Sequence, residues 1–153
     1  MIYTSYFAKL RNLPENFTPI SICAKPPAGY SGLEYKKLAP KYGFFMQWKK
    51  DHDNEAYLRC FDQQVLADKN PYCIVDELYN LLDDETKMWL EMYDCPPWEN
   101  PDYHIVLICY EKPGDFCHRI HVGKWLSDHG IHVEEWKSNG ATSEPPIPNP
   151  VVS

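Results

Sequence analysis

The chain has 153 residues and a formal net charge of -7, with 44% hydrophobic and 14% aromatic residues. A chain of this length and composition can bury the core of one globular domain, which excludes an intrinsically disordered protein. The acidic balance argues against a broad basic surface for nucleic acid, and no apolar stretch is long enough to span a membrane.

The N-terminal part alternates short extended runs with turn-forming residues. Residues 2–7 and 19–24 are rich in β-branched and apolar side chains and predict two strands. Asn and Pro residues between them interrupt any long helix. Residues 25–43 contain three Pro and three Gly. A segment of this length and composition predicts an ordered surface loop with at most one helical turn.

The middle of the chain is predicted to be helical. Apolar residues recur with the 3.6-residue period over residues 53–67 and again over 71–82, where Pro71 suits a first helical turn. A third helical stretch covers residues 84–93. It ends before the Pro-rich residues 95–101, which lead into the next strand.

The segment 105–136 has the pattern of a strand, a helix and a second strand. Residues 105–108 are four consecutive apolar residues and predict a buried strand. Asp115 is placed to cap a helix over residues 116–129. Residues 131–136 then predict the last strand of the chain.

Strands near both ends with helices between them predict an α/β fold. We expect a three-layer Rossmann-like sandwich with a small, mostly parallel sheet flanked by helices. Residues 1–136 would form a single domain. Residues 137–153 include four Pro and show no apolar period. They predict a mobile or extended tail that can contact a protein partner.

The six cysteines do not have the pattern of a disulfide framework. The sequence contains no CxxC motif, and several cysteines lie inside apolar runs. The first residues also lack the features of a signal peptide. We therefore predict a cytoplasmic protein whose thiols are reduced and mostly structural.

The predicted topology gathers chemically active side chains at one edge of the sheet. In open parallel sheets, ligands bind at the carboxyl ends of the strands. A helix that starts beside these ends adds unpaired N–H donors, which favour anions and ionised thiols. The residues that we expect at this edge are Tyr6, Lys25, Tyr30, Cys109, Glu111, Cys117, His118 and Arg119.

Arg119 and Lys25 are the predicted anion-binding residues at this edge. A guanidinium can hold a phosphate or carboxylate through two parallel N–H bonds, although Arg119 could instead form a salt bridge to Glu111. Tyr30, Tyr35 or Trp48 would stack on a ligand base or sugar ring, or these aromatic residues would instead cover the edge of the sheet. Tyr6 and Cys109 would complete the ligand-binding surface.

Glu111, Cys117 and His118 are the candidates for catalysis. Glu111 is a candidate for proton transfer, and Cys117 beside His118 is a candidate nucleophile. The alternative for Cys117 is a packed or hydrogen-bonding thiol. Cys109, Cys117, His118 and His121 also form a set of metal donors, but their spacing is looser than that of ordinary zinc sites.

The stretch LICYEKPGDFCHRIHVGKWL resembles the signature of the domain-of-unknown-function 488 family, in which a strand ending Cys-x-Glu precedes a Cys-His-Arg triplet that opens a helix. The stretch PISICAKPPAGYSGLEYKKLAP is similar to a second block of that family, and the opening Ile-Tyr-Thr to its first strand. The resemblance covers most of residues 2–136. The chain departs from the family at Lys25, where the second strand often carries an Arg, and residues 83–101 are a local elaboration. The resemblance implies the fold and the edge of the sheet but no activity.

The function favoured by the sequence is binding of a phosphate-bearing small molecule such as a nucleotide, with or without catalysis. This prediction includes no cofactor and no metal. A non-catalytic regulatory or adaptor domain with a structural Cys-His-Arg network is one alternative. A metal-dependent hydrolase is another.

Overall fold

The structure, a computed structural model, describes residues 1–137 and contains a five-stranded sheet. All the strand pairs in the described part of the chain are parallel. The sheet order is β3-β2-β4-β1-β5. The strands are β1 (Ile2–Tyr6), β2 (Phe17–Ser21), β3 (Leu33–Glu34), β4 (His104–Cys109) and β5 (Val133–Glu135).

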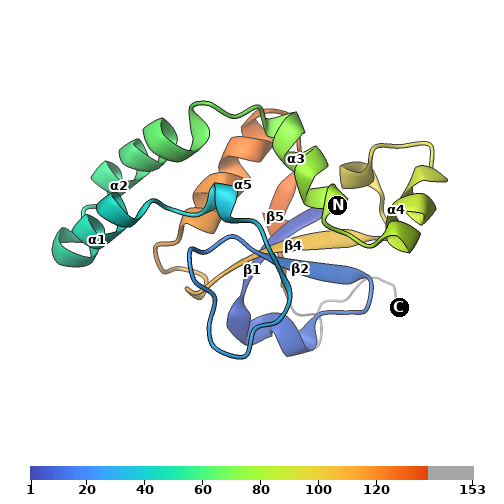
Figure 1. The fold of residues 1–153 in the computed structure, drawn as a ribbon, viewed down its shortest axis with the longest axis horizontal. Coiled ribbons are helices and arrows are strands. Elements are labelled where there is room, and N and C mark those ends of the chain that lie inside the picture. Colours follow the sequence, from blue (N-terminus) through green and yellow to red (C-terminus); the bar gives the residue numbers. More distant parts are fainter. Residues whose placement is uncertain (138–153) are drawn as a thin grey trace.

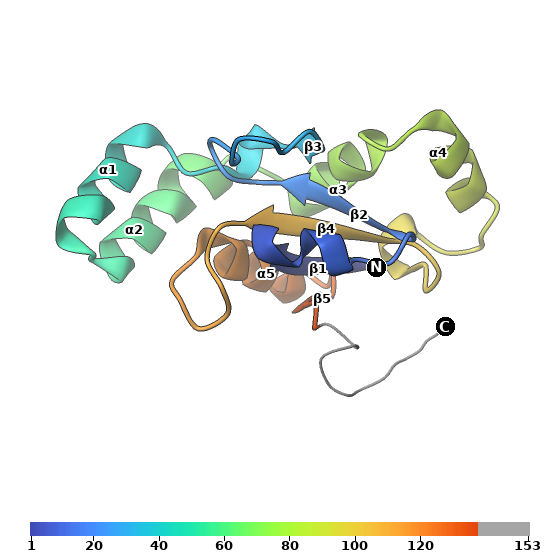
Figure 2. The same cartoon turned by 90° about the horizontal axis from the view of Figure 1, so that it is seen from below.

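Helical segments cover both faces of this sheet. The helices are α1 (Tyr42–Asp51), α2 (Asn54–Phe61), α3 (Pro71–Asn80), α4 (Asp84–Glu91) and α5 (His118–Asp128), with shorter turns η1 (Phe7–Asn12), η2 (Lys36–Leu38), η3 (Asp62–Leu66) and η4 (Pro97–Glu99). Helices α3 and α5 lie on one face and η1 lies on the other (Figure 1, Figure 2). The predicted three-layer, Rossmann-like α/β architecture is confirmed.

Strand β4 lies between β1 and β2, and all six of its residues are buried. Side chains alternate across a strand, so Ile105 and Leu107 enter the main hydrophobic core with residues of α3 and α5. Val106 and Ile108 are buried on the opposite face. A central parallel strand is covered on both sides, which is why its sequence is apolar without interruption.

Helix α1 corrects the sequence prediction for the Pro- and Gly-rich segment. The prediction placed a loop up to Gly43, but α1 begins at Tyr42. The helix buries Phe44, whose ring packs edge-to-face on Tyr57 and Phe61 of α2. These tertiary contacts stabilise a helix that local composition disfavours.

Two predicted element boundaries also differ from the structure. Strand β2 runs over Phe17–Ser21 rather than 19–24, although the N–H of Ile22 still donates to the carbonyl of Ile108 at 3.1 Å. Helix α5 begins at His118, so its N-cap is Cys117 rather than Asp115. The N–H of Asp115 instead closes a turn onto the carbonyl of Lys112.

The proline-rich tail, with its predicted partner contact, lies outside the described residues from position 138 onward. Within residues 1–137, no helix combines the length and the apolar character that crossing a bilayer requires.

Gly123 sets the distance between α5 and the sheet. A Cβ atom at this position would lie 3.2 Å from Cγ1 of Val133 in β5 and 3.7 Å from Cγ2 of Thr4 in β1. A larger side chain therefore has to push the helix away from both strands.

We expect Gly123→Leu to lower the free energy of unfolding by about 2 kcal/mol because it overpacks this contact. Gly43→Ala is the control, since a Cβ there meets no atom within 4 Å; it should be neutral or stabilise by about 0.5 kcal/mol. Urea unfolding followed by circular dichroism measures both. Equal stability of the two variants would contradict close packing at Gly123.

Candidate functional site

A cavity of about 510 Å³ opens at the carboxyl end of β4. Helices α1 and α2 extend beyond this end of the sheet and supply one wall (Figure 2). The structure brings together five of the residues predicted from the sequence, because this cavity is lined by Lys25, Cys109, Glu111, Cys117 and His118. The position agrees with the rule that ligands bind at the carboxyl ends of parallel strands.

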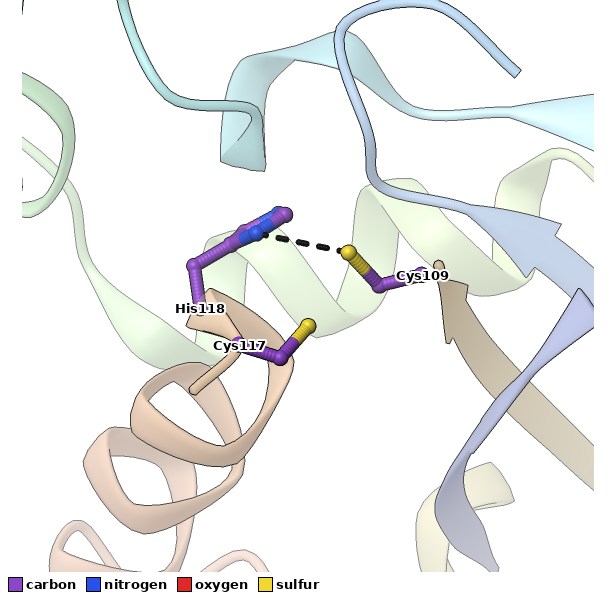
Figure 3. Close-up of side chains that lie close together, drawn as sticks. All are labelled: Cys109, Cys117 and His118. Carbon is purple, nitrogen blue, oxygen red and sulfur yellow. Dashed lines mark hydrogen bonds between the residues drawn. The ribbon is translucent and has the colours of Figure 1, made fainter. Parts of the chain in front are cut away.

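Two thiols and one imidazole meet at the floor of the cavity (Figure 3). The Sγ atoms of Cys109 and Cys117 and a ring nitrogen of His118 lie within 4.8 Å of one another, and all three residues are buried. Cys109 ends β4 on the same side of the strand as Leu107, and it therefore faces the start of α5. Cys117 and His118 are the N-cap and first residue of that helix.

The hydrogen bonds of His118 fix which of its ring nitrogens carries the proton. Its Nε2 lies 2.8 Å from the carbonyl oxygen of Ile22, which can only accept. Nε2 of the neutral ring must therefore be the N–H donor. The lone pair of Nδ1 then points toward Sγ of Cys109, 3.5 Å away.

The pKa values of the two thiols are shifted in opposite directions. The hydrogen bond shared with Cys109 lowers the pKa of Cys117, against the opposing effect of burial. The same hydrogen bond, together with burial, raises the pKa of Cys109. The two thiols therefore titrate as one coupled pair, in which Cys117 is the more acidic thiol.

Glu111 stands beside this pair, two residues after the end of β4. Sγ of Cys109 lies 3.8 Å from Oε1 of Glu111. Burial raises the pKa of Glu111, and the charge on Cys117 raises it further. A carboxyl group in this environment exchanges a proton at a higher pH than an exposed glutamate does.

Arg119 does not line the cavity, which corrects its predicted role as an anion-binding residue. The side chain is fully buried, at 0% exposure. Its Nη2 and Nε donate to the two carboxylate oxygens of Glu135, at 2.9 and 3.2 Å. Its Nη1 donates to the backbone carbonyl of Glu111, so the alternative salt bridge to the Glu111 carboxylate is also wrong.

Tyr6 and Tyr30 lie outside the cavity as well. The ring of Tyr6 lies beneath the guanidinium of Arg119, 5.7 Å from its Cζ. The hydroxyl of Tyr30 donates to the carbonyl of Leu33 at 2.6 Å, and its ring packs on Phe7. Both tyrosines therefore pack against the protein around the site, and neither is placed to contact a ligand in the cavity.

Of the aromatic side chains in the cavity wall, the sequence prediction named only Trp48, because helix α1 was not predicted. Phe45, Trp48 and Lys49 line the cavity from this helix, Tyr57 from α2 and Phe116 from the loop before α5. The aromatic residues within 42–48 have a helical spacing and could have predicted α1. Pro40 and Gly43, which are typical of loops, favoured a loop prediction instead.

His121, the fourth predicted metal donor, is not part of the cluster. Its Nε2 lies 2.6 Å from a carboxylate oxygen of Asp62 at the surface. The i, i+3 spacing from His118 therefore does not bring the two imidazoles to one site.

Searches of this chain against models of protein families, against curated proteins and against solved structures returned no match. The likeness to the domain-of-unknown-function 488 family therefore remains a resemblance in sequence motifs.

We expect Arg119→Met to lower the free energy of unfolding by about 3 kcal/mol, because it leaves the Glu135 carboxylate and the Glu111 carbonyl without their donor. Lys124→Met is the control on the same helix, since it removes only an exposed pair with Asp128. Urea unfolding measures both variants. A loss no larger than that of Lys124→Met would show that the buried pair does not hold the fold.

The lowered pKa predicts that Cys117 remains reactive in mild acid. With metals removed by a chelator, alkylation of Cys117 should hold its rate below pH 7, where a free thiol, with a pKa of about 8.5, slows tenfold per pH unit. Peptide mass spectrometry measures the rate, and the denatured chain supplies the reference. A midpoint equal to that of the denatured chain would identify Cys117 as a packed, protonated thiol.

Proposed function

We propose that this protein binds a phosphate-bearing small molecule, with a nucleotide as the best fit, in the cavity at the carboxyl end of β4. The observation that carries the proposal is the pairing of two lysines with an aromatic wall around one cavity. Lys25 comes after β2, Lys49 lies on α1, and both line the cavity.

Both lysines are available to an anion. Lys25 and Lys49 are exposed, and among residues 1–137 neither ammonium group forms an ion pair. Nζ of Lys49 lies over the ring of Phe45, 5.2 Å from its centroid, at the edge of the cavity. Two ammonium groups can share the charge of one phosphate without the desolvation that a buried cation requires.

The remaining wall suits a flat ring. Phe45, Trp48, Tyr57 and Phe116 surround the cavity on the side of α1 and α2. Aromatic side chains supply apolar area and stack on heterocycles. A volume of about 510 Å³ lies within the range of small-molecule sites. A nucleotide matches this lining, because its phosphate would contact the two lysines and its base would stack against the aromatic wall.

The floor adds groups that can act on a bound molecule. Glu111 is the proton-transfer candidate, and the Cys117 thiolate is the nucleophile candidate, with His118 beside it. This arrangement favours a catalytic use of the cavity over a purely structural network, since a thiolate stabilised at a cavity floor is exposed to whatever the cavity binds.

Ligand binding should depend on the two lysines. In a screen by thermal shift, nucleotides should raise the melting temperature of the parent chain more than the corresponding nucleosides do. Lys25→Ala and Lys49→Ala should each weaken the best ligand about tenfold in calorimetric titration, the loss of one charge-assisted contact. Added salt should weaken binding to the parent chain in the same direction.

Lys50→Ala is the matched control, because Lys50 is exposed on α1 but does not line the cavity. It should bind the ligand as the parent chain does. No response to any phosphorylated compound, or equal affinities for the Lys25, Lys49 and Lys50 variants, would refute the proposal.

A further inference from the structure

We propose that Sγ of Cys109, Sγ of Cys117 and Nδ1 of His118 form a zinc site at the floor of the cavity, with the fourth coordination position open to the cavity. The favoured sequence prediction included no metal, because the spacing of these residues differs from that of common zinc motifs, and a metal-dependent hydrolase was only an alternative. The fold brings the three side chains together although they are far from such a motif in sequence. The zinc site does not depend on phosphate binding by the lysines, but with zinc bound Cys117 is a metal ligand and not a free nucleophile.

The distance between Cys109 and His118 matches one edge of a tetrahedral zinc site, and the third donor lies close by. With Zn–S near 2.3 Å and Zn–N near 2.0–2.1 Å, the tetrahedral edge between sulfur and nitrogen is about 3.5 Å and that between two sulfurs about 3.8 Å. Sγ of Cys109 lies 3.5 Å from Nδ1 of His118, and all three donor atoms lie within 4.8 Å of one another. An ion can enter this group without rearrangement of the backbone.

The imidazole is already oriented as a metal ligand. A histidine that binds zinc through one nitrogen almost always donates the other N–H to a carbonyl or carboxylate, which fixes the ring and its tautomer. Nε2 of His118 donates to the carbonyl of Ile22 at 2.8 Å, deep in the structure. The lone pair of Nδ1 is therefore directed at Sγ of Cys109, 3.5 Å away, and within the described residues this is its one hydrogen-bond contact.

Several acceptors surround the single S–H of Cys109. Nδ1 of His118 and Oε1 of Glu111 lie 3.5 and 3.8 Å from Sγ of Cys109, and the sulfur of Cys117 lies within 4.8 Å of it. One S–H can serve only one of these acceptors. A divalent cation bound to both sulfurs and to Nδ1 would hold these three donors in one arrangement.

Three protein ligands at the floor of an open cavity are the pattern of catalytic zinc sites, whereas structural sites close with four. Cys23 is buried nearby but does not complete a set of four, since its Sγ lies 3.1 Å from Oγ of Ser21 and it is outside the donor group. Glu111 is placed beside the open position and can accept a proton from water bound there.

The test uses the full chain, reduced and stripped of metal, and titrates it with Co²⁺ and Zn²⁺ alone. We expect one equivalent of Co²⁺ to give thiolate charge-transfer absorption in the near ultraviolet and the visible bands of tetrahedral cobalt, both displaced by one equivalent of Zn²⁺. Binding of Zn²⁺ should also protect two of the six free cysteines from a thiol reagent and raise the melting temperature.

Variants identify the donors. Cys109→Ser, Cys117→Ser and His118→Gln should each lose the cobalt spectrum or shift it to that of a weaker site. Cys23→Ser, which changes a buried thiol next to the group, and His121→Gln, on the same helix, should keep it. Lys25→Ala should keep the cobalt spectrum as well, because Lys25 is not a metal donor. This variant therefore distinguishes a loss of phosphate binding from a loss of metal binding.

Several results would overturn the zinc site. These are the absence of a cobalt spectrum in the reduced parent chain, a spectrum unchanged by Cys117→Ser, and a loss in Cys23→Ser as large as in Cys117→Ser. The protected thiols keep the test decisive even where a variant fails to fold, because peptide mapping of the parent chain shows directly whether Cys109 and Cys117 are the two that zinc shields.

Discussion

The position of the site depends on one buried ion pair, between Arg119 and Glu135. Arg119 is the largest fully buried side chain in the described part of the chain. Its guanidinium joins the first turn of α5 to β5, through Glu135, and to the loop after β4, through the carbonyl of Glu111. Glu135 in turn accepts from Oγ1 of Thr4 in β1 at 2.6 Å. A charge in this environment is tolerated only where its donors are satisfied, so the contact admits few other geometries.

The ion pair between Arg119 and Glu135 also fixes the position of the groups at the floor of the cavity. Cys117 and His118 are the two residues before Arg119, and their backbone is therefore fixed relative to β5 and to the end of β4. On the other side, His118 hydrogen-bonds to the carbonyl of Ile22, the residue that directly follows β2. Three strands and one helix thus determine where two sulfurs and one nitrogen meet. A site with this many attachments needs little reorganisation to bind an ion or a reacting group.

The sequence predicted the elements whose signals are local. An uninterrupted apolar run identified β4, and because parallel strands end at one edge, Cys109, Glu111 and Cys117 were expected together. The sequence could not identify the partner of Arg119, since Glu111 and Glu135 are both chemically suitable and only the fold selects between them. It also missed α1, because Gly43 and Pro40 are loop-forming residues and the helix is stabilised by contacts of Phe44 with α2.

The wall and the floor of the cavity come from separate parts of the fold. The floor is built on strand ends inside the sheet, while much of the wall stands on the pair α1–α2, which extends beyond the sheet and turns at His52 with a left-handed backbone. Substitutions at the wall positions of α1 reshape this enclosure, whereas Phe61 of α2 packs on the His118 ring, with 5.6 Å between the ring centroids. The shape of the cavity can therefore be altered from α1 while the two thiols and the imidazole keep the backbone that positions them.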